Sequence, residues 1–257
     1  MGLSPEALTN FLEENAEERE DGTYNKVTGC KIAACVPMHT FGFPAKIIEL
    51  RNICDQWRIP IVEDAAEGVG SKLDGRALGT FGKFGTFSFN GNKVITSGGG
   101  GMIVTENIED GRRAKHLTTT GKTHHKFEYH HDTIAYNYRL PNLNAALLVA
   151  QIKQLEAFLS AKRKLASIYL DFFDGTDVIF RSERPGTTAN YWLMCIELLD
   201  RTRVNTFLEK TNSAGIMTRP IWELMHTLPM YGNCYRDDQK NATMLKTKIV
   251  NIPSNPK

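Results

Sequence analysis

The feature that most constrains the fold is a strand–helix–strand pattern within residues 31–63. Residues Lys31–Val36 (KIAACV) form a short apolar run, which predicts a buried strand. Apolar residues then recur at helical spacing between Pro44 and Trp57, and Ile59–Glu63 (IPIVE) is a second apolar run. Two strands joined by one helix form a βαβ unit. The sequence therefore predicts an α/β fold with a mainly parallel sheet and helices on its faces.

Further elements follow in the same part of the chain. We predict strands at Gly85–Phe89 and Gly101–Thr105, and a helix at Asn107–Thr119. The stretch Gly121–Asp132 (GKTHHKFEYHHD) is polar and lacks periodicity, so it is expected to be irregular. Residues 1–141 are therefore assigned to one domain.

A long helical pattern from Asn142 to Tyr169 is expected to bridge to a second domain. After it the sequence predicts a strand at Tyr191–Leu198, a helix at Arg201–Ser213 and a short strand at 216–218. This succession is typical of a smaller α+β unit. The second domain, including the bridging helix, is assigned to residues 142–257.

Composition excludes several functional classes. The net charge of +2 over 257 residues is too small to indicate binding to nucleic acid or to an anionic membrane. No run of about eighteen apolar residues is present, so no transmembrane helix is predicted. The five cysteines show no C-x-x-C spacing, so we expect no metal site and no disulfide framework. Reduced thiols in a cytoplasmic protein are the better interpretation.

Acidic residues follow the second predicted strand directly, in the segment Glu63–Glu67 (EDAAE). The carboxyl end of a parallel strand is where α/β folds bind ligands, so Asp64 is a candidate binding residue. The alternative, that Asp64 caps a turn or helix, is about as well supported by the sequence alone.

Lys93 follows the predicted strand Gly85–Phe89 and precedes four glycines, Gly98–Gly101. A lysine in such a place is most often an ordinary surface residue. However, the residues after it are small or apolar, and a partly desolvated lysine can act as a nucleophilic amine. The glycines permit close backbone approach and could serve a phosphate, but a tight connection between strands is the preferred interpretation. No G-x-G-x-x-G opens a helix, which disfavours a dinucleotide site.

Asn137 and Arg139 lie just before the long helix. Either could serve an anion near a helix N-terminus, and a role in fixing the start of the helix is an equal alternative.

Taken together, these segments resemble the DegT/DnrJ/EryC1/StrS family of sugar aminotransferases, which have the aspartate-aminotransferase (type I) fold. The matching segments, in the order of the family, are His39–Gly42, Val62–Glu67, Gly85–Phe89, Lys93, Gly98–Met102 and Asn137–Arg139. The segment SFNGNKVITSGGGGMIVT is similar to the branch that makes 4-amino-4,6-dideoxy sugars. Thr218–Trp222 and Leu224–His226 resemble its LegC-like members, which act on UDP- or GDP-linked 4-keto-6-deoxy amino sugars.

The resemblance implies a role for each matching residue and pyridoxal phosphate as the cofactor. Lys93 would bind the cofactor covalently and shuttle a proton between the donor Cα and C4′ of the cofactor. Asp64 would pair with the pyridinium nitrogen, and Glu67 would approach the phenolic oxygen, where the family also uses His or Gln. Ser88 would bind the phosphate, and Asn137 would reach the cofactor phosphate of a neighbouring subunit, which implies a homodimer.

The resemblance also implies the reaction and weaker candidates for the substrate site. The expected activity moves an amino group from L-glutamate to a nucleotide-linked 4-keto-6-deoxy sugar. Arg139 is a candidate for the glutamate carboxylate or the substrate diphosphate, and Trp222 and His226 are candidates for lining the sugar site. Some relatives carry histidine at the lysine position and act as dehydratases, so Lys93 favours transamination.

Relatives in the family carry a substantial segment before the position matched by Met1, and they continue beyond the residues similar to Ile249–Ser254. The resemblance therefore implies a fragment with a partial large domain, without a phosphate-binding turn and a ring-stacking aromatic residue. Two hypotheses follow: a functional aminotransferase, or a non-catalytic remnant that retains Lys93 but cannot hold the cofactor.

Overall fold

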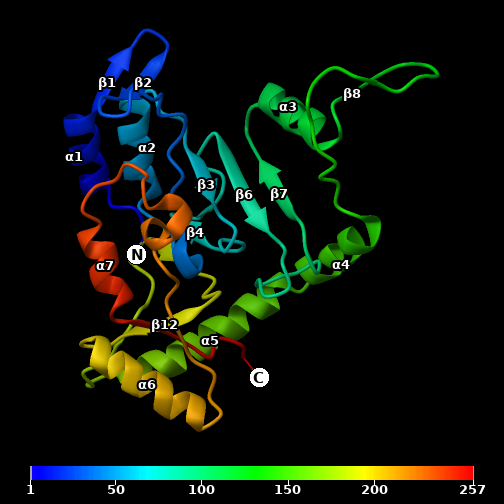
Figure 1. Ribbon diagram of the computed structural model, residues 1–257. Coiled ribbons are helices and arrows are strands. Elements are labelled where there is room, and N and C mark those ends of the chain that lie inside the picture. Colours follow the sequence, from blue (N-terminus) through cyan, green and yellow to red (C-terminus); the bar gives the residue numbers. More distant parts are fainter. Residues whose placement is uncertain (1, 257) are drawn as a thin grey trace.

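The computed structural model describes residues 2–256 and places a three-stranded sheet at the centre of the first part of the chain (Figure 1). The sheet consists of β3 (Val62–Asp64), β6 (Phe84–Ser88) and β7 (Gly101–Val104), in that order. The predicted parallel pairing is confirmed for β3 and β6, with Asp64 opposite Thr86. β7 runs antiparallel to β6, because the loop between them turns the chain back along its neighbour.

Helices α1 (Pro5–Asn15) and α2 (Ile47–Gln56) pack together beside this sheet (Figure 1). Their buried residues form one apolar cluster with the segments before and after β3: Leu12, Ala16, Ala45, Ile47, Leu50, Cys54, Ile59, Ile61, Leu73, Leu78 and Phe81. The amphipathic spacing that predicted α2 is thus explained by burial of one helix face.

The run Lys31–Val36 was expected to be a buried strand, and this prediction is only partly correct. Cys35 pairs in parallel with Ile61, and Met38 with Asp64, so the chain does run beside β3. However, these are isolated bridges, and Val36 is 60% exposed. Successive side chains of an extended segment point to opposite sides, and only one side of this segment is covered.

Helix α3 (Ile108–Thr118) confirms the helix predicted at 107–119. Asn107 caps its N-terminus, because its side chain accepts hydrogen bonds from the N–H groups of Glu109 and Asp110. The stretch 121–132 is not wholly irregular, because β8 (Lys122–Thr123) and β9 (His130–His131) form a short antiparallel hairpin that projects away from the body of the protein (Figure 1). Five further short strands form two small sheets. β1 (Ala16–Arg19) pairs with β2 (Gly22–Asn25), and β4 (Lys72–Leu73) pairs with both β5 (Arg76–Ala77) and β11 (Thr187–Thr188).

The single long helix predicted over 142–169 is wrong, because the chain forms two helices, α4 (Asn142–Ile152) and α5 (Leu155–Phe173). At the break, the N–H of Gln154 donates to the carbonyl of Gln151, and Gln154 has φ −105° and ψ 0°. Neither proline nor glycine marks this position, so nothing in the local sequence indicates the turn.

The second part of the chain contains a four-stranded antiparallel sheet in the order β10–β12–β14–β13. Its strands are β10 (Ile179–Phe180), β12 (Met194–Glu197), β13 (Arg219–Pro220) and β14 (Ile249–Ile252). Helices α5 and α6 (Arg201–Ser213) contact this sheet, and α7 (Lys240–Lys246) precedes β14. The predicted α6 is confirmed with its bounds, whereas the strand expected at 216–218 lies slightly later, at β13.

Lys162 on α5 anchors the segment that leads into β12. Its buried Nζ donates to the carbonyls of Tyr191 (3.3 Å), Trp192 (3.2 Å) and Ser254 (2.8 Å). Burial lowers the pKa of Lys162 to about 8, because a low dielectric disfavours the ammonium form. This contact fixes Trp192, which reaches the candidate site described below.

Within residues 2–256, no helix combines the length and apolar character needed to cross a membrane.

Candidate active site

The carboxyl end of β3 is held by a fully buried carboxylate, that of Glu63. It accepts hydrogen bonds from the ring Nε2 of His39 (3.0 Å) and from the backbone N–H groups of Gly79 (2.8 Å), Phe81 (2.5 Å) and Gly82 (2.7 Å). Burial opposes ionisation, but the hydrogen bonds from His39, Gly82 and Gly79 outweigh it and lower the pKa of Glu63. Glu63 thereby fixes the strand end from which Asp64 projects.

The turn His39–Gly42 connects this strand end to a second carboxylate. The backbone N–H of His39 donates to the carbonyl of Asp64 (3.1 Å), and the ring Nδ1 of His39 accepts from the N–H of Ala45 (3.1 Å). Phe41 is fully buried with φ +60°, a strained conformation for a residue with a side chain, and its N–H donates to Glu67 Oε2 (2.7 Å). The strained turn therefore aims a backbone donor at Glu67.

Lys93 lies in a confined position beside Glu67. Its Nζ is 3.7 Å from Glu67 Oε1 and 4.0 Å from the ring centroid of Trp192, and its side chain is only 13% exposed. An ammonium over the face of an indole is attracted by the ring quadrupole. Lys93 is thus held between a carboxylate and an aromatic face rather than projecting into solvent.

Glu67 has an unusual protonation equilibrium. Burial, the largest influence, raises its pKa from 4.5 to about 7. The hydrogen bond from Phe41 and the charge of Lys93 act in the opposite direction, whereas the nearby Asp64 carboxylate raises the pKa further. At neutral pH both forms of Glu67 are populated, so it can give or take a proton beside Lys93.

This shift predicts a pH-dependent stability. Because the pKa of Glu67 is higher in the folded state, the folded protein binds more protons between about pH 4.5 and pH 7, and its stability falls as the pH rises through that window. The shift corresponds to about 3 kcal/mol, reduced here to about 2 kcal/mol for residual solvent contact. Glu67→Gln keeps an acceptor for Phe41 but cannot ionise.

We therefore expect Glu67→Gln to raise the free energy of unfolding by about 2 kcal/mol more at pH 8 than at pH 5, measured by urea denaturation. Glu49→Gln, on the outer face of α2, is the matched control and should show the same small effect at both pH values. An equal effect of Glu67→Gln at the two pH values would contradict the raised pKa.

Two indole rings lead from Lys93 toward the surface, and a buried phenyl ring packs against the outer one. Trp192 contacts Trp222 with ring centroids 6.0 Å apart, and Trp222 contacts Phe41 at 5.0 Å. The indole Nε1 of Trp192 donates to the carbonyl of Asn92 (2.6 Å), which ties the second part of the chain to the residue before Lys93. Trp222 is 44% exposed, so this aromatic row ends at an accessible face.

A sequence model of the DegT/DnrJ/EryC1/StrS aminotransferase family matches residues 20–257. The chain belongs to this family. Its relatives include a GDP-perosamine synthase of Vibrio cholerae, 37% identical over 88% of this chain and 62% of that protein. They also include a UDP-N-acetyl-3-dehydro-alpha-D-glucosamine 3-aminotransferase of Acidithiobacillus ferrooxidans, 28% identical over 87% of this chain and 59% of that protein.

The fold of this family member is similar to a crystal structure of a DegT DnrJ EryC1 StrS aminotransferase from Brucella abortus. The TM-score is 0.84, at 22% identity, over 99% of this chain and 65% of that one. The predicted type I fold of pyridoxal-phosphate-dependent transferases is therefore confirmed. The chain spans about 60% of the length of the curated relatives it matches.

Ser88 lies on the same sheet face as Asp64 in this member of the DegT/DnrJ/EryC1/StrS family. Asp64 pairs with Thr86 in the parallel register, and residues two apart on a strand share a face, so Ser88 follows Thr86 on the side of Asp64. Its hydroxyl accepts from the N–H of Asn90 (3.3 Å). Ser88 is thus placed one strand away from Asp64, at the turn that leads to Lys93.

The remaining predicted residues are not brought to Lys93. Asn137 is exposed and forms an isolated bridge with Thr119, on the segment that follows the projecting hairpin. Arg139 lines a separate cavity of about 780 Å³, whose wall includes Thr86 and the glycines at 99–101. His226 is half-buried in the short 3₁₀ helix Met225–Thr227 and, within residues 2–256, makes no ion pair or aromatic contact with the other candidates.

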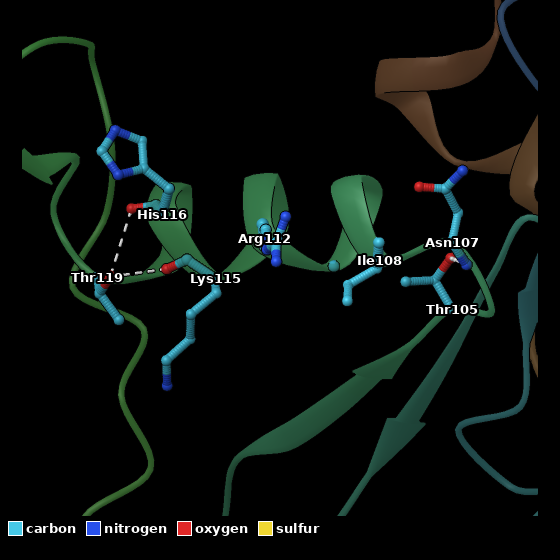
Figure 2. Close-up of a pocket in the computed structure, with 8 residues that line it drawn as sticks. Thr105, Asn107, Ile108, Arg112, Lys115, His116 and Thr119 are labelled. Atoms are coloured by element: carbon cyan, nitrogen blue, oxygen red, sulfur yellow. Dashed lines mark hydrogen bonds between the residues drawn. The ribbon is translucent and has the colours of Figure 1, made fainter.

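A second cavity, of about 540 Å³, lies along α3 (Figure 2). Its lining includes Arg112, Lys115 and His116, but none of the residues predicted to carry the chemistry. Figure 2 shows Lys115 and His116 pointing to opposite sides of the helix, so the basic groups do not converge on one point.

Sequence reasoning missed Trp192 and gave Phe41 no role of its own within the matching segment His39–Gly42. Trp192 lies in an apolar run that predicts only a buried strand, and its contact with Lys93 joins distant parts of the chain. Phe41 acts through its backbone N–H, and the only local signal is the neighbouring glycine, which also has a positive φ.

Proposed function

We propose that this chain carries the catalytic residues of a pyridoxal-phosphate-dependent sugar-nucleotide aminotransferase. The observation that carries the proposal is the enclosure of the Lys93 amine between the Glu67 carboxylate and the Trp192 ring, next to the strand end that presents Asp64. A confined lysine amine with an adjacent proton donor and acceptor suits both covalent attachment to an aldehyde and later proton movement.

The residues present fit pyridoxal phosphate. One carboxylate oxygen of Asp64 accepts a hydrogen bond from the N–H of Ala66 (3.1 Å), so the other oxygen is available to the ring nitrogen. Glu67, which titrates near neutrality, suits the phenolic oxygen, and the Ser88 hydroxyl suits the phosphate. When bound, the cofactor supplies an electron sink that stabilises a carbanion at the amino-acid Cα.

Lys93, Asp64 and Glu67 would then each have a separate role in the reaction. Lys93 Nζ would hold the cofactor and afterwards carry the proton between the donor Cα and C4′. Asp64 would keep the ring nitrogen protonated through its negative charge. Glu67 would exchange a proton with its neighbours without a large change in free energy, because its pKa of about 7 lies near the working pH.

For the substrates, we propose L-glutamate as amino donor and a nucleotide-linked 4-keto-6-deoxy sugar as acceptor. Two relatives are named for GDP- or UDP-linked sugars, and the residues 218–226 resemble the LegC-like branch. Trp222 is the best placed of the substrate candidates, because its exposed ring continues the aromatic row from Lys93. Arg139 and His226 remain candidates for the diphosphate or glutamate carboxylate and for the sugar.

Incubation of the purified chain with pyridoxal phosphate tests the proposal. We expect a visible absorption band that disappears on borohydride reduction, with the mass of the reduced cofactor on the peptide that contains Lys93. A protein that stays colourless after incubation would instead support the non-catalytic remnant.

We further propose that the active form is a homodimer. Helix α4 is apolar on all sides, yet Leu148 is its only buried residue, while Leu143, Leu147, Val149 and Ile152 are 44–87% exposed. A helix that is apolar on all sides is normally buried, so we propose that a second copy of this chain packs against the exposed residues of α4. Asn137 lies on the segment just before this helix, where it could reach a neighbouring subunit.

The double variant Leu147→Lys/Val149→Lys tests the dimer. We expect the dimer dissociation constant to rise at least about tenfold, because two cations would have to be desolvated in an apolar interface. The double variant Ile168→Lys/Phe172→Lys on α5 is the matched control, since these residues are 55% and 72% exposed. Sedimentation velocity would contradict the proposal if the wild-type chain were monomeric, or if both variants behaved alike.

A further inference from the structure

The hairpin between β8 and β9 gathers an unusual set of side chains. Four of the seven histidines of the chain lie within residues 124–131. In the hairpin register Thr123 pairs with His130, and the loop folds His125 back so that the His125 and His130 rings meet edge to face, 4.6 Å apart. The cluster belongs to the β8–β9 hairpin, which projects away from the body of the protein (Figure 1).

A carboxylate completes this cluster. Glu128 Oε2 is 2.8 Å from His130 Nε2 and 4.0 Å from His125 Nδ1. One nitrogen from each ring and one carboxylate oxygen all lie within 4.8 Å of one another. We propose that His125, Glu128 and His130 form a binding site for a divalent first-row transition metal ion, with Zn²⁺ as the probe.

The charges of the hairpin leave Glu128 available to a cation. Within residues 2–256 its ion-pair partners are these two histidines, and neither Lys122 nor Lys126 pairs with it. The ammonium groups of Lys122 and Lys126 lie over the rings of Tyr129 and Phe127, at 4.3 Å and 5.0 Å. The carboxylate is therefore not neutralised by the neighbouring cations.

The donor set selects the class of ion. Two imidazoles and one carboxylate suit Zn²⁺, Ni²⁺ or Cu²⁺, whereas Mg²⁺ and Ca²⁺ prefer sites built from oxygen alone. Ligand atoms around one tetrahedral Zn²⁺ lie roughly 3.3 Å apart. The 4.0 Å between His125 Nδ1 and Glu128 Oε2 must therefore shorten, whereas the 2.8 Å between His130 Nε2 and the same oxygen must lengthen as this nitrogen loses to solvent the proton that it donates to Glu128. His125 Nδ1 must also give up its hydrogen bonds from Phe127 (3.3 Å) and Glu128 (2.9 Å). These changes are small, because the three residues are exposed.

Isothermal titration of the chelator-treated full chain with Zn²⁺ tests this proposal. We expect one saturable site per chain, unaffected by excess Mg²⁺. His125→Ala, Glu128→Gln and His130→Ala should each weaken Zn²⁺ binding at least about tenfold. The controls are His124→Ala, the adjacent histidine outside the cluster, and the distant His226→Ala, which should stay within about twofold of wild type.

Two results would overturn the site. One is the absence of saturable Zn²⁺ binding by the wild-type chain. The other is an equal loss in His124→Ala and in His125→Ala, which would show that a flexible histidine tract binds the ion without the assembled cluster. Because the three residues of the cluster are exposed, each of their variants is expected to stay folded, and a thermal melt of each variant checks this directly.

Discussion

Replacing Lys93 with alanine is expected to abolish both cofactor attachment and amino transfer. The variant removes the amine that lies between Glu67 and Trp192, and with it the group proposed to hold the cofactor and carry the proton. Loss of positioned proton transfer alone lowers rates by about 10²–10⁴-fold, and loss of covalent attachment adds to this, so we expect at least about 10⁴-fold lower turnover. The measurements are borohydride-trapped cofactor and amino transfer from L-glutamate to the keto sugar nucleotide.

Two controls separate chemistry from folding. Lys93→Arg keeps a cation over Trp192 and beside Glu67, but a guanidinium does not lose its proton and cannot attack an aldehyde, so this variant should be equally inactive. Lys83→Ala removes an exposed lysine that pairs with Asp110 at 3.4 Å, and it should behave as wild type. Substantial turnover by either Lys93 variant would remove this residue from the proposed role.

The sequence placed candidate residues at the ends of two predicted strands, and the resemblance to the family gave them their proposed roles. Asp64 and Lys93 became candidates because each follows the end of a strand, whereas the role of Glu67 came from the resemblance. Periodicity and strand ends are local properties, and the structure confirms parallel pairing at these two strands and brings Glu67 and Lys93 within 3.7 Å.

The parts that sequence reasoning missed depend on contacts between distant segments. Lys162 on α5 binds the carbonyl of Trp192, and the indole of Trp192 donates to the carbonyl of Asn92, which brings its ring to Lys93. The break between α4 and α5 has no proline or glycine, so the helical pattern appeared continuous. The projecting hairpin was predicted to be irregular because short cross-strand pairing leaves no apolar alternation to detect.

Replacing Asp64 with asparagine is expected to lower turnover by about 10²–10³-fold, the usual effect of removing one fixed electrostatic partner from an active site. Asparagine has nearly the same shape and can still accept the N–H of Ala66, so the strand end should be preserved. It carries no charge, however, and would no longer hold a proton on the ring nitrogen. We therefore expect Lys93 still to trap the cofactor while turnover falls.

The same variant has a second, independent readout. Because the Asp64 charge raises the folded-state pKa of Glu67, Asp64→Asn should lower the upper end of the pH window through which stability falls and make the total fall smaller. Asp55→Asn is the matched control, since Asp55 is an exposed residue paired with Arg51 at 3.5 Å on α2, and it should change neither turnover nor this window. Wild-type turnover in Asp64→Asn would exclude Asp64 from the chemistry. If turnover stayed normal while the pH range of the Glu67 titration fell, the role of Asp64 would be limited to raising the pKa of Glu67.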